Sequence, residues 1–264
     1  ADLYNHDPKT LAGIYSAHWT WMLGYPDEAE RVMDATAQHA RKRGHAFDLC
    51  YALSWGSYAF AYRVEPEKLR NRNQSAIDLG REQGLPFYSD LLGPLYHAVA
   101  TFLEGRFSGA VTELGISIGV WQQLNLNVCA PYFKAVRAEA LVHTGDHEGA
   151  LSLIDESIEQ AERPGWEEGP HLAEILRIKG WILQQQGRRD EAEQSLHASI
   201  EVARKQQAKS WELRTSTTLA GLWQSQGKIN EARDLLAPIC GWFTEGFDTK
   251  DLKEAKALLD ELHT

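Results

Sequence analysis

The chain has 264 residues, of which 43% are hydrophobic and 24% charged, a composition typical of a globular protein rather than a disordered or membrane-embedded one. Asp and Glu number 37 against 27 Lys and Arg, and the net charge of -10 argues against nucleic-acid binding. There is no apolar run of about 18 residues, no signal-peptide layout, and only three widely spaced cysteines. We therefore expect a soluble, cytoplasmic protein without disulfides or membrane contact. The chain starts without Met and enters a helical pattern at once, which suggests a segment of a longer protein.

A repeated signal, a Gly followed five residues later by Ala, runs through the chain. From Gly105 onward the glycines lie 40, 42 and 40 residues apart, and the 81 residues between Gly24 and Gly105 equal two such periods. A further repeat is therefore expected over residues 47–82, with its turn at the Val64-Glu65-Pro66 break. The five observed pairs are Gly24/Ala29, Gly105/Ala110, Gly145/Ala150, Gly187/Ala192 and Gly227/Ala232.

Each period has the pattern of a helix, a short turn and a second helix. Glycine allows the positive φ that commonly ends a helix, and acidic residues follow in the next first turn, where the helix dipole favours them. The pattern predicts six antiparallel helix pairs with turns at or within two residues of the five glycines and Val64. The predicted repeats span approximately 8–45, 46–85, 86–127, 128–166, 167–208 and 209–246.

The tail departs from this pattern. Gly246 is predicted to end the last helix of the sixth repeat, with Phe247 covering that end. A shorter amphipathic helix then follows over 248–263. One of its faces is apolar and the other charged, as the end of a stacked array requires. The chain is thus predicted to be a single all-α solenoid domain over 1–264, closed by this capping helix. The apolar face comprises Leu252, Ala255, Leu258, Leu259 and Leu262.

The fifth and sixth repeats resemble the tetratricopeptide repeat. Their period of about 40 is longer than the usual 34 and would also suit HEAT repeats, and the closing Pro is missing, but the Gly-to-Ala register favours the tetratricopeptide family. The resemblance implies a right-handed superhelix of helix pairs whose first helices line a concave groove. The matching residues are Leu176, Gly180, Leu183, Gly187, Ala192 and Leu196, then Leu219, Ala220, Trp223, Gly227, Ala232 and Leu236.

Residues 21–29 and 237–248 resemble the C-terminal repeat region of large bacterial signalling proteins. In those proteins a class III adenylate/guanylate cyclase or a DNA-binding domain precedes an AAA-type or STAND ATPase. The resemblance implies a regulatory role in signal transduction, without an active site or cofactor in this segment. No nucleotide-binding loop of the form GxxxxGK[ST] occurs in the chain.

The chain offers little sign of catalysis. His143 and His147 have the spacing of two metal ligands on one helix, but they flank the predicted turn at Gly145, so no metal site is predicted. Adjacent carboxylates such as Glu167 and Glu168 do not face each other on a helix. An α/α-barrel enzyme using groove carboxylates stays open as an alternative, and so does a self-association module or homodimer.

The predicted groove is aromatic at one end and charged at the other. Three tyrosines, Tyr51, Tyr58 and Tyr62, share one helix face and are predicted to be partly exposed, with Arg177 and Arg214 facing the same space to meet an acidic ligand group. We expect a non-catalytic scaffold that binds a peptide, a protein segment, a domain of the same parent protein or a small-molecule effector. The predicted groove residues are His18, Trp21, Tyr51, Tyr58, Tyr62, Phe102, Tyr132, Glu139, Arg177 and Arg214.

Overall fold

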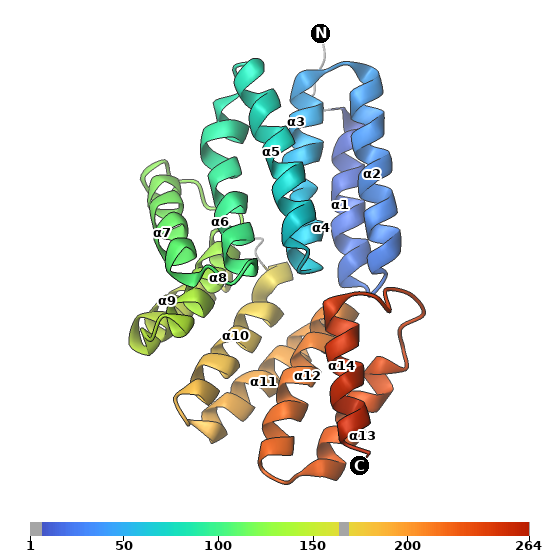
Figure 1. Ribbon diagram of the computed structural model, residues 1–264, viewed down its shortest axis with the longest axis vertical. Helices are drawn as coiled ribbons and strands as arrows, with labels where there is room; N and C mark the ends of the chain where they lie inside the picture. Colours follow the sequence, from blue (N-terminus) through green and yellow to red (C-terminus); the bar gives the residue numbers. More distant parts are fainter. Residues whose placement is uncertain (1–6, 164–168, 264) are drawn as a thin grey trace. The chain divides into compact units, whose positions relative to one another are not determined.

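The computed structural model describes residues 7–163 and 169–263, and within these ranges the chain is helical and contains no strand (Figure 1). The all-α class predicted from the repeat pattern is confirmed. The helices follow one another as hairpins: α1 (Pro8–Met22) and α2 (Pro26–Arg43); α3 (Ala46–Trp55), α4 (Ser57–Tyr62) and α5 (Pro66–Glu82); η1 (Phe87–Leu92), α6 (Gly93–Leu103) and α7 (Phe107–Gln123); α8 (Ala130–His143) and α9 (His147–Ala161); η2 (Gly169–His171), α10 (Leu172–Gln185) and α11 (Arg189–Lys205); α12 (Lys209–Ser225) and α13 (Ile229–Cys240); then α14 (Lys250–Glu261).

The turn inside each hairpin has the same construction. The residue at the predicted position has a positive φ in all six cases, from +58° at Val64 to +99° at Gly24. A backbone bond then closes each turn from the residue after it to a carbonyl five residues earlier, as in a Schellman motif. The six predicted turn positions are thus confirmed. The closing bonds join Tyr25 to Thr20, Glu65 to Phe60, Arg106 to Thr101, Asp146 to Leu141, Arg188 to Leu183, and Lys228 to Trp223.

The alanine five residues after each turn glycine lies in the hairpin interior. All five of these alanines, from Ala29 to Ala232, have no solvent exposure. Only a small side chain permits the close approach of two helices just beyond a short turn. The Gly-to-Ala spacing therefore indicates where the two helices of each hairpin pack closely together.

Two first helices are interrupted. In the second repeat Gly56 separates α3 from α4. In the third, the π-helical segment η1 continues directly into α6, and the amide of Gly93 donates to the carbonyl of Tyr88, five residues earlier. Pro94 explains this change of winding, because its nitrogen carries no hydrogen and cannot bond the carbonyl of Asp90 four residues before it.

The chain forms two compact units, which we describe separately. Unit 1 comprises residues 1–21 and 25–123, and unit 2 comprises residues 22–24 and 124–264. The single continuous domain stays a prediction. In unit 2 the core passes from one hairpin to the next, with Ile154 and Ile175 in one buried cluster and Leu196 and Leu219 in another.

The helix α14 covers the last hairpin. Leu252, Ala255 and Leu262 are buried in one cluster with residues of α12 and α13, while Leu258 and Leu259 are partly buried against it. The end of the sixth repeat differs from the prediction. Helix α13 stops at Cys240, and Gly246 lies in the connection, where its φ of +74° turns the chain. Phe247, the residue that follows this turn, is 65% exposed, so it does not cover the end of a helix as predicted.

None of the helices in the described ranges has the length and apolar character needed to cross a bilayer.

Candidate functional site

In unit 1 the aromatic residues predicted to line a groove are packed together. Tyr51, Tyr58 and Tyr62 are 8%, 4% and 1% exposed. The expectation of a partly exposed tyrosine stripe is therefore wrong. Helix α4, which carries Tyr58 and Tyr62, contacts α2, α5 and α6, and all six of its residues are buried. Helix α3, which carries Tyr51, contacts α2, α5 and η1.

Helix α1 contributes two further rings to this aromatic cluster. Trp21 is 2% exposed and its ring lies 4.7 Å from that of Tyr62. His18, which is partly exposed, meets Tyr58 and Tyr62 edge-on at centroid distances of 5.6 and 5.4 Å. Such edge-to-face pairs stabilise a core beyond the area that they bury. Phe102 is partly exposed on α6, and its ring lies 5.8 Å from that of Phe107.

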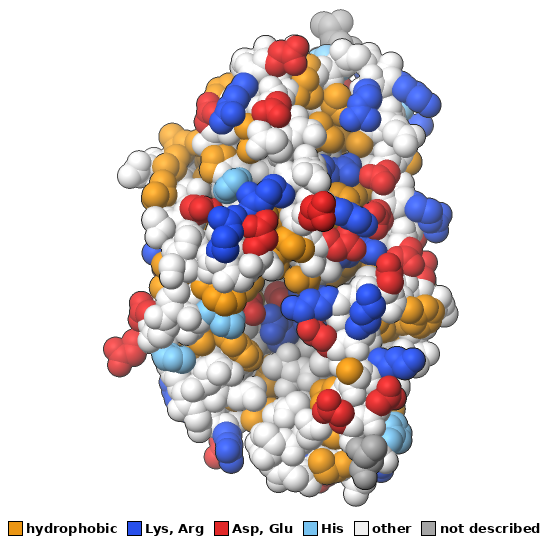
Figure 2. Space-filling view, viewed as in Figure 1, with side chains coloured by type: hydrophobic (Ala, Val, Ile, Leu, Met, Phe, Trp, Pro, Cys, Tyr) orange, Lys and Arg blue, Asp and Glu red, His pale blue; other side chains and the backbone are white. Residues whose placement is uncertain are grey.

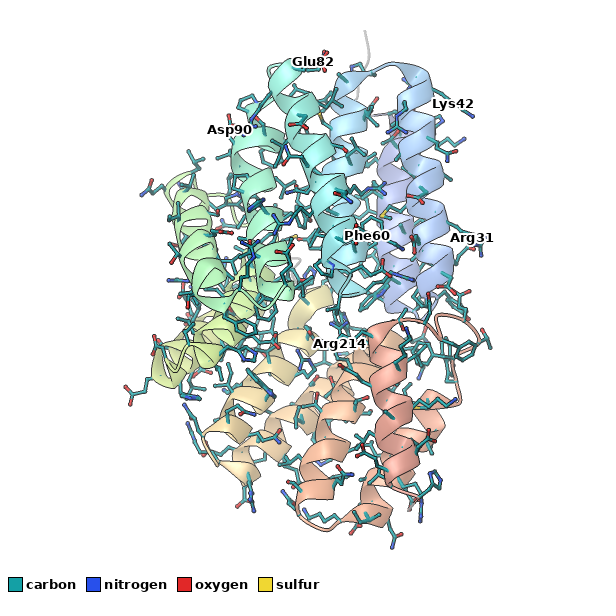
Figure 3. The ribbon with its side chains drawn as sticks, in the orientation of Figure 1. Arg31, Lys42, Phe60, Glu82, Asp90 and Arg214 are labelled. Atoms are coloured by element: carbon teal, nitrogen blue, oxygen red, sulfur yellow. The ribbon has the colours of Figure 1, made fainter. Side chains whose placement is uncertain are left out.

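In unit 2 the predicted charged residues converge. Arg177 of α10 donates two bonds to Glu174, one turn earlier, at 2.8 and 3.0 Å. Arg214 of α12 reaches the same carboxylate at 3.1 Å and also donates to both oxygens of Asp251 on α14, at 3.0 and 2.6 Å. Glu139 of α8 lies 3.8 Å from Arg177. We call these five residues the ionic cluster. Figure 3 labels Arg214, whose helix lies beside α14.

The charges of the ionic cluster do not cancel, since three carboxylates surround two guanidinium groups. Burial raises the pKa of Glu139, and Arg177 only partly offsets this effect. Burial also opposes the ionisation of Glu174, but Arg177 and Arg214 together hold its pKa below the ordinary value. The pKa values of both arginines are raised by these carboxylates in spite of their burial. Glu139 is therefore the least compensated charge in the ionic cluster.

Aromatic side chains border the ionic cluster within unit 2. Tyr132 of α8 is 5% exposed, its ring lies 5.1 Å from that of His171, and burial raises the pKa of its hydroxyl. The guanidinium of Arg214 lies 5.0 Å over the ring of Trp211. Trp211 in turn donates its indole N–H to the carbonyl of Pro170. Through Trp211, these contacts help to hold the guanidinium of Arg214 in place.

The structure thus brings together four of the predicted groove residues, Tyr132, Glu139, Arg177 and Arg214, on successive first helices of unit 2. That these residues share one groove with the tyrosines of unit 1 stays a prediction. Sequence reasoning missed Asp251 because the charged residues of the capping helix were not predicted to contact the rest of the chain. A signal existed: Asp251 directly precedes Leu252, so it lies at the edge of the face that packs on the sixth repeat.

Comparison with known proteins places these observations in a family context. Residues 131–156 and 173–198, which hold Glu139, Glu174 and Arg177, match the family model of the tetratricopeptide repeat. No curated protein sequence matches the chain.

Several solved structures are similar to the chain. One is NprR in complex with its cognate peptide NprX, with a TM-score of 0.66, 15% identity, and coverage of 97% of this chain and 72% of that one. A Rap protein complexed with competence and sporulation factor has a TM-score of 0.64 at 12% identity, covering 97% and 75%. A STAND protein with a tetratricopeptide repeat sensor from Pyrococcus horikoshii has a TM-score of 0.55 at 10% identity, covering 96% and 38%. These similarities establish a tetratricopeptide-like helical fold.

Proposed function

We propose that this chain is a non-catalytic scaffold that binds a peptide or protein segment along the first helices α8, α10 and α12 of unit 2. The observation that carries the proposal is the ionic cluster, in which charged side chains from three successive first helices meet. Buried charges are costly to keep, so their concentration on one set of helices favours a binding role over a purely structural one.

The similar structures support the ligand class. NprR is described with a cognate peptide, and the similar Pyrococcus protein is described as having a tetratricopeptide repeat sensor. In a longer parent protein, a segment bound here would regulate catalytic or DNA-binding domains, as the resemblance of residues 21–29 and 237–248 implies. This regulatory role is part of the proposal.

The excess of carboxylates in the ionic cluster favours a basic ligand group over an acidic one. Arg177 and Arg214 already donate to carboxylates within the chain, so an acidic ligand would have to displace Glu174 or Asp251. Glu139, in contrast, is 21% exposed and has one long contact of 3.8 Å with Arg177. A lysine, an arginine or an amino terminus on the ligand would complete its pairing.

The two glutamates also bear on the enzyme alternative. Their pKa values are shifted in opposite directions, which is the pattern of an acid and a base. Both oxygens of Glu174, however, accept bonds from Arg177, and one also accepts from Arg214. A carboxylate held in this way is poorly placed to take a proton from a substrate, so the geometry favours binding.

A peptide-display selection with the purified chain tests the proposal. We expect enriched peptides to contain lysine or arginine, and Glu139→Gln to weaken their binding by about tenfold, in the range of a hydrogen bond to a charged group. Glu201→Gln, which changes an exposed carboxylate on α11, is the matched control and should leave binding unchanged. The proposal is wrong if no peptide is enriched, or if the two variants bind equally well.

A further inference from the structure

A second candidate site lies in unit 1 and shares no residue with the ionic cluster. A pocket of about 420 Å³ opens between the second and third repeats, with walls from α5, η1, α6 and α7. Its volume is in the range of roughly 300–1,000 Å³ that is usual for small-molecule sites. The pocket is lined by Gln74, Ile77, Arg81, Ser89, Pro94, His97, Glu113, Ile116 and Ser117.

The local winding of the chain shapes this pocket. Pro94 forms part of the wall and causes the switch from the π-helical turn to α6, and π-helical turns are frequent at functional sites. Gly93 lets Ile77 pack closely, because a Cβ there would lie 2.5 Å from Cγ1 of Ile77. Gly80 similarly allows η1 to approach α5, since its Cβ would lie 3.2 Å from the amide nitrogen of Ser89. In Figure 3, the labels Glu82 and Asp90 identify α5 and η1.

Helix α7, which forms one wall of the pocket, carries exposed aliphatic residues on its outer surface. Helix α7 carries one charged residue, Glu113, and its surface includes Ile116, 65% exposed, and Val120, 36% exposed. Figure 2 shows hydrophobic side chains along the surface margin next to this helix. Exposed aliphatic residues next to a pocket with an apolar floor are typical of a ligand site.

One cation lines this pocket without a carboxylate partner. On α5, Lys68 pairs with Glu30, Arg70 with Glu104, and Arg72 with Asp34. Arg81, one turn beyond Ile77, has no carboxylate within ion-pair distance in the described parts of the chain. The acid in the pocket wall, Glu113, already accepts a bond of 2.9 Å from Thr101. Charge recognition in this pocket therefore favours an anionic group at Arg81.

We propose that this pocket binds a small amphiphile that has an apolar chain and a single carboxylate. The apolar chain packs on Ile77, Pro94 and Ile116, and the carboxylate pairs with Arg81. The site is independent of the peptide surface in unit 2 and would provide a second input to the same protein.

Decanoate, at concentrations below micelle formation, is the probe that tests the proposal, with decanol and decylamine as matched probes. We expect saturable decanoate binding by calorimetry and methyl chemical-shift changes at Ile77 and Ile116. Arg81→Gln should weaken decanoate binding roughly two- to fivefold, as for an exposed ion pair, and should leave decanol binding unchanged. Ile116→Gln, a surface change that the fold tolerates, should weaken both. Arg189→Gln, at an exposed position on α11, is the control for net charge.

Three results would overturn the proposal: shifts spread over other methyl groups, decanol or decylamine binding as tightly as decanoate, or an effect of Arg81→Gln no larger than that of Arg189→Gln. Because the probe and its readout lie in unit 1, failure here leaves the peptide proposal untouched, and failure of the peptide selection leaves this one untouched.

Discussion

Arg214 holds Asp251 through both carboxylate oxygens, at 3.0 and 2.6 Å, and each side chain is only 15% exposed. The same guanidinium donates to Glu174, so one residue connects the fifth repeat, the sixth repeat and α14. Glu174 also accepts bonds from Arg177, so ion pairs connect Arg177, Glu174, Arg214 and Asp251 in a continuous series. The stability of the capping helix and the electrostatics of the proposed peptide surface are therefore linked.

Substitution of the two glutamates of the ionic cluster should change the free energy of unfolding differently. Glu174→Gln leaves two buried arginines undercompensated, and we expect a loss of about 3–5 kcal/mol in the free energy of unfolding at pH 7. Glu139→Gln removes the carboxylate whose ionisation burial disfavours, so it should leave the stability unchanged or raise it. Urea denaturation of both variants measures the difference, and equal destabilisation would contradict our assignment of charges.

The pH dependence of the stability follows from the opposite directions in which the pKa values of Glu174 and Glu139 are shifted. The pKa of Glu174 is lowered in the folded state, so its ionised carboxylate stabilises the fold. This stabilisation is complete above the pKa of about 4.3 that a glutamate has in the unfolded chain, and it is lost as the pH falls through the folded-state pKa. The pKa of Glu139 is raised, so ionising it costs stability as the pH rises from about 4.3 through its folded pKa. Compared with the native chain, Glu139→Gln should therefore lose less stability as the pH rises from 4 to 7.

Tyr58 should behave as a core residue. Its ring lies 5.3 Å from Tyr62 and 5.2 Å from Tyr96 and is 4% exposed. Tyr58→Ala should therefore lower the free energy of unfolding by about 3–5 kcal/mol, the cost of truncating a buried aromatic ring. Tyr58→Phe, which keeps the ring, is the control and should lose much less. A folded Tyr58→Ala variant of near-native melting temperature would restore the sequence-based prediction of an exposed tyrosine.

Val64 is the strained member of the six turns. It adopts φ +58°, a conformation that costs a β-branched residue about 1–2 kcal/mol and that glycine adopts freely. Val64→Gly should raise the free energy of unfolding by about 0.5–1 kcal/mol, because the greater freedom of glycine in the unfolded chain offsets part of the gain. The reverse change, Gly187→Val, should destabilise through backbone strain alone, since a Cβ there meets no atom within 4 Å. Thermal denaturation compares the two, and stabilisation by neither or by both would exclude this account.

The turns were predictable because a positive φ and a buried alanine each select one residue type, so the backbone geometry is visible in the sequence. Even Val64 was located, from the period and the following proline. The exposure of the tyrosines was not predictable, because helical spacing places them on one face without showing what covers it. Here α4 is covered by α2, α5 and α6, and its contacts with α2 and α6 join residues far apart in the chain. The same limit hid Asp251, whose partner Arg214 lies 37 residues earlier.

Cutting the chain after Gly246 should destabilise the sixth repeat. The cut removes Leu252, Ala255 and Leu262 from the cluster that they share with Leu236 and Phe243, and each large buried side chain contributes roughly 1.5–3 kcal/mol. It also takes Asp251 from Arg214, a largely buried guanidinium that still donates to Glu174. We expect the free energy of unfolding to fall by several kcal/mol and the truncated chain to aggregate through the newly exposed apolar face.

Replacing the exposed Lys253 and Lys256 by Gln in the full chain is the control for the truncation, because it changes α14 without touching its packing. This double change should cost less than about 0.5 kcal/mol in the free energy of unfolding. The single variant Asp251→Asn separates the two contributions: if α14 acts through apolar packing alone, it should match the native chain in urea denaturation, whereas the linkage through Arg214 requires a loss of about 1.5–3 kcal/mol. A truncated chain that sediments as one species and melts at the native temperature would show that α14 does not cap the array.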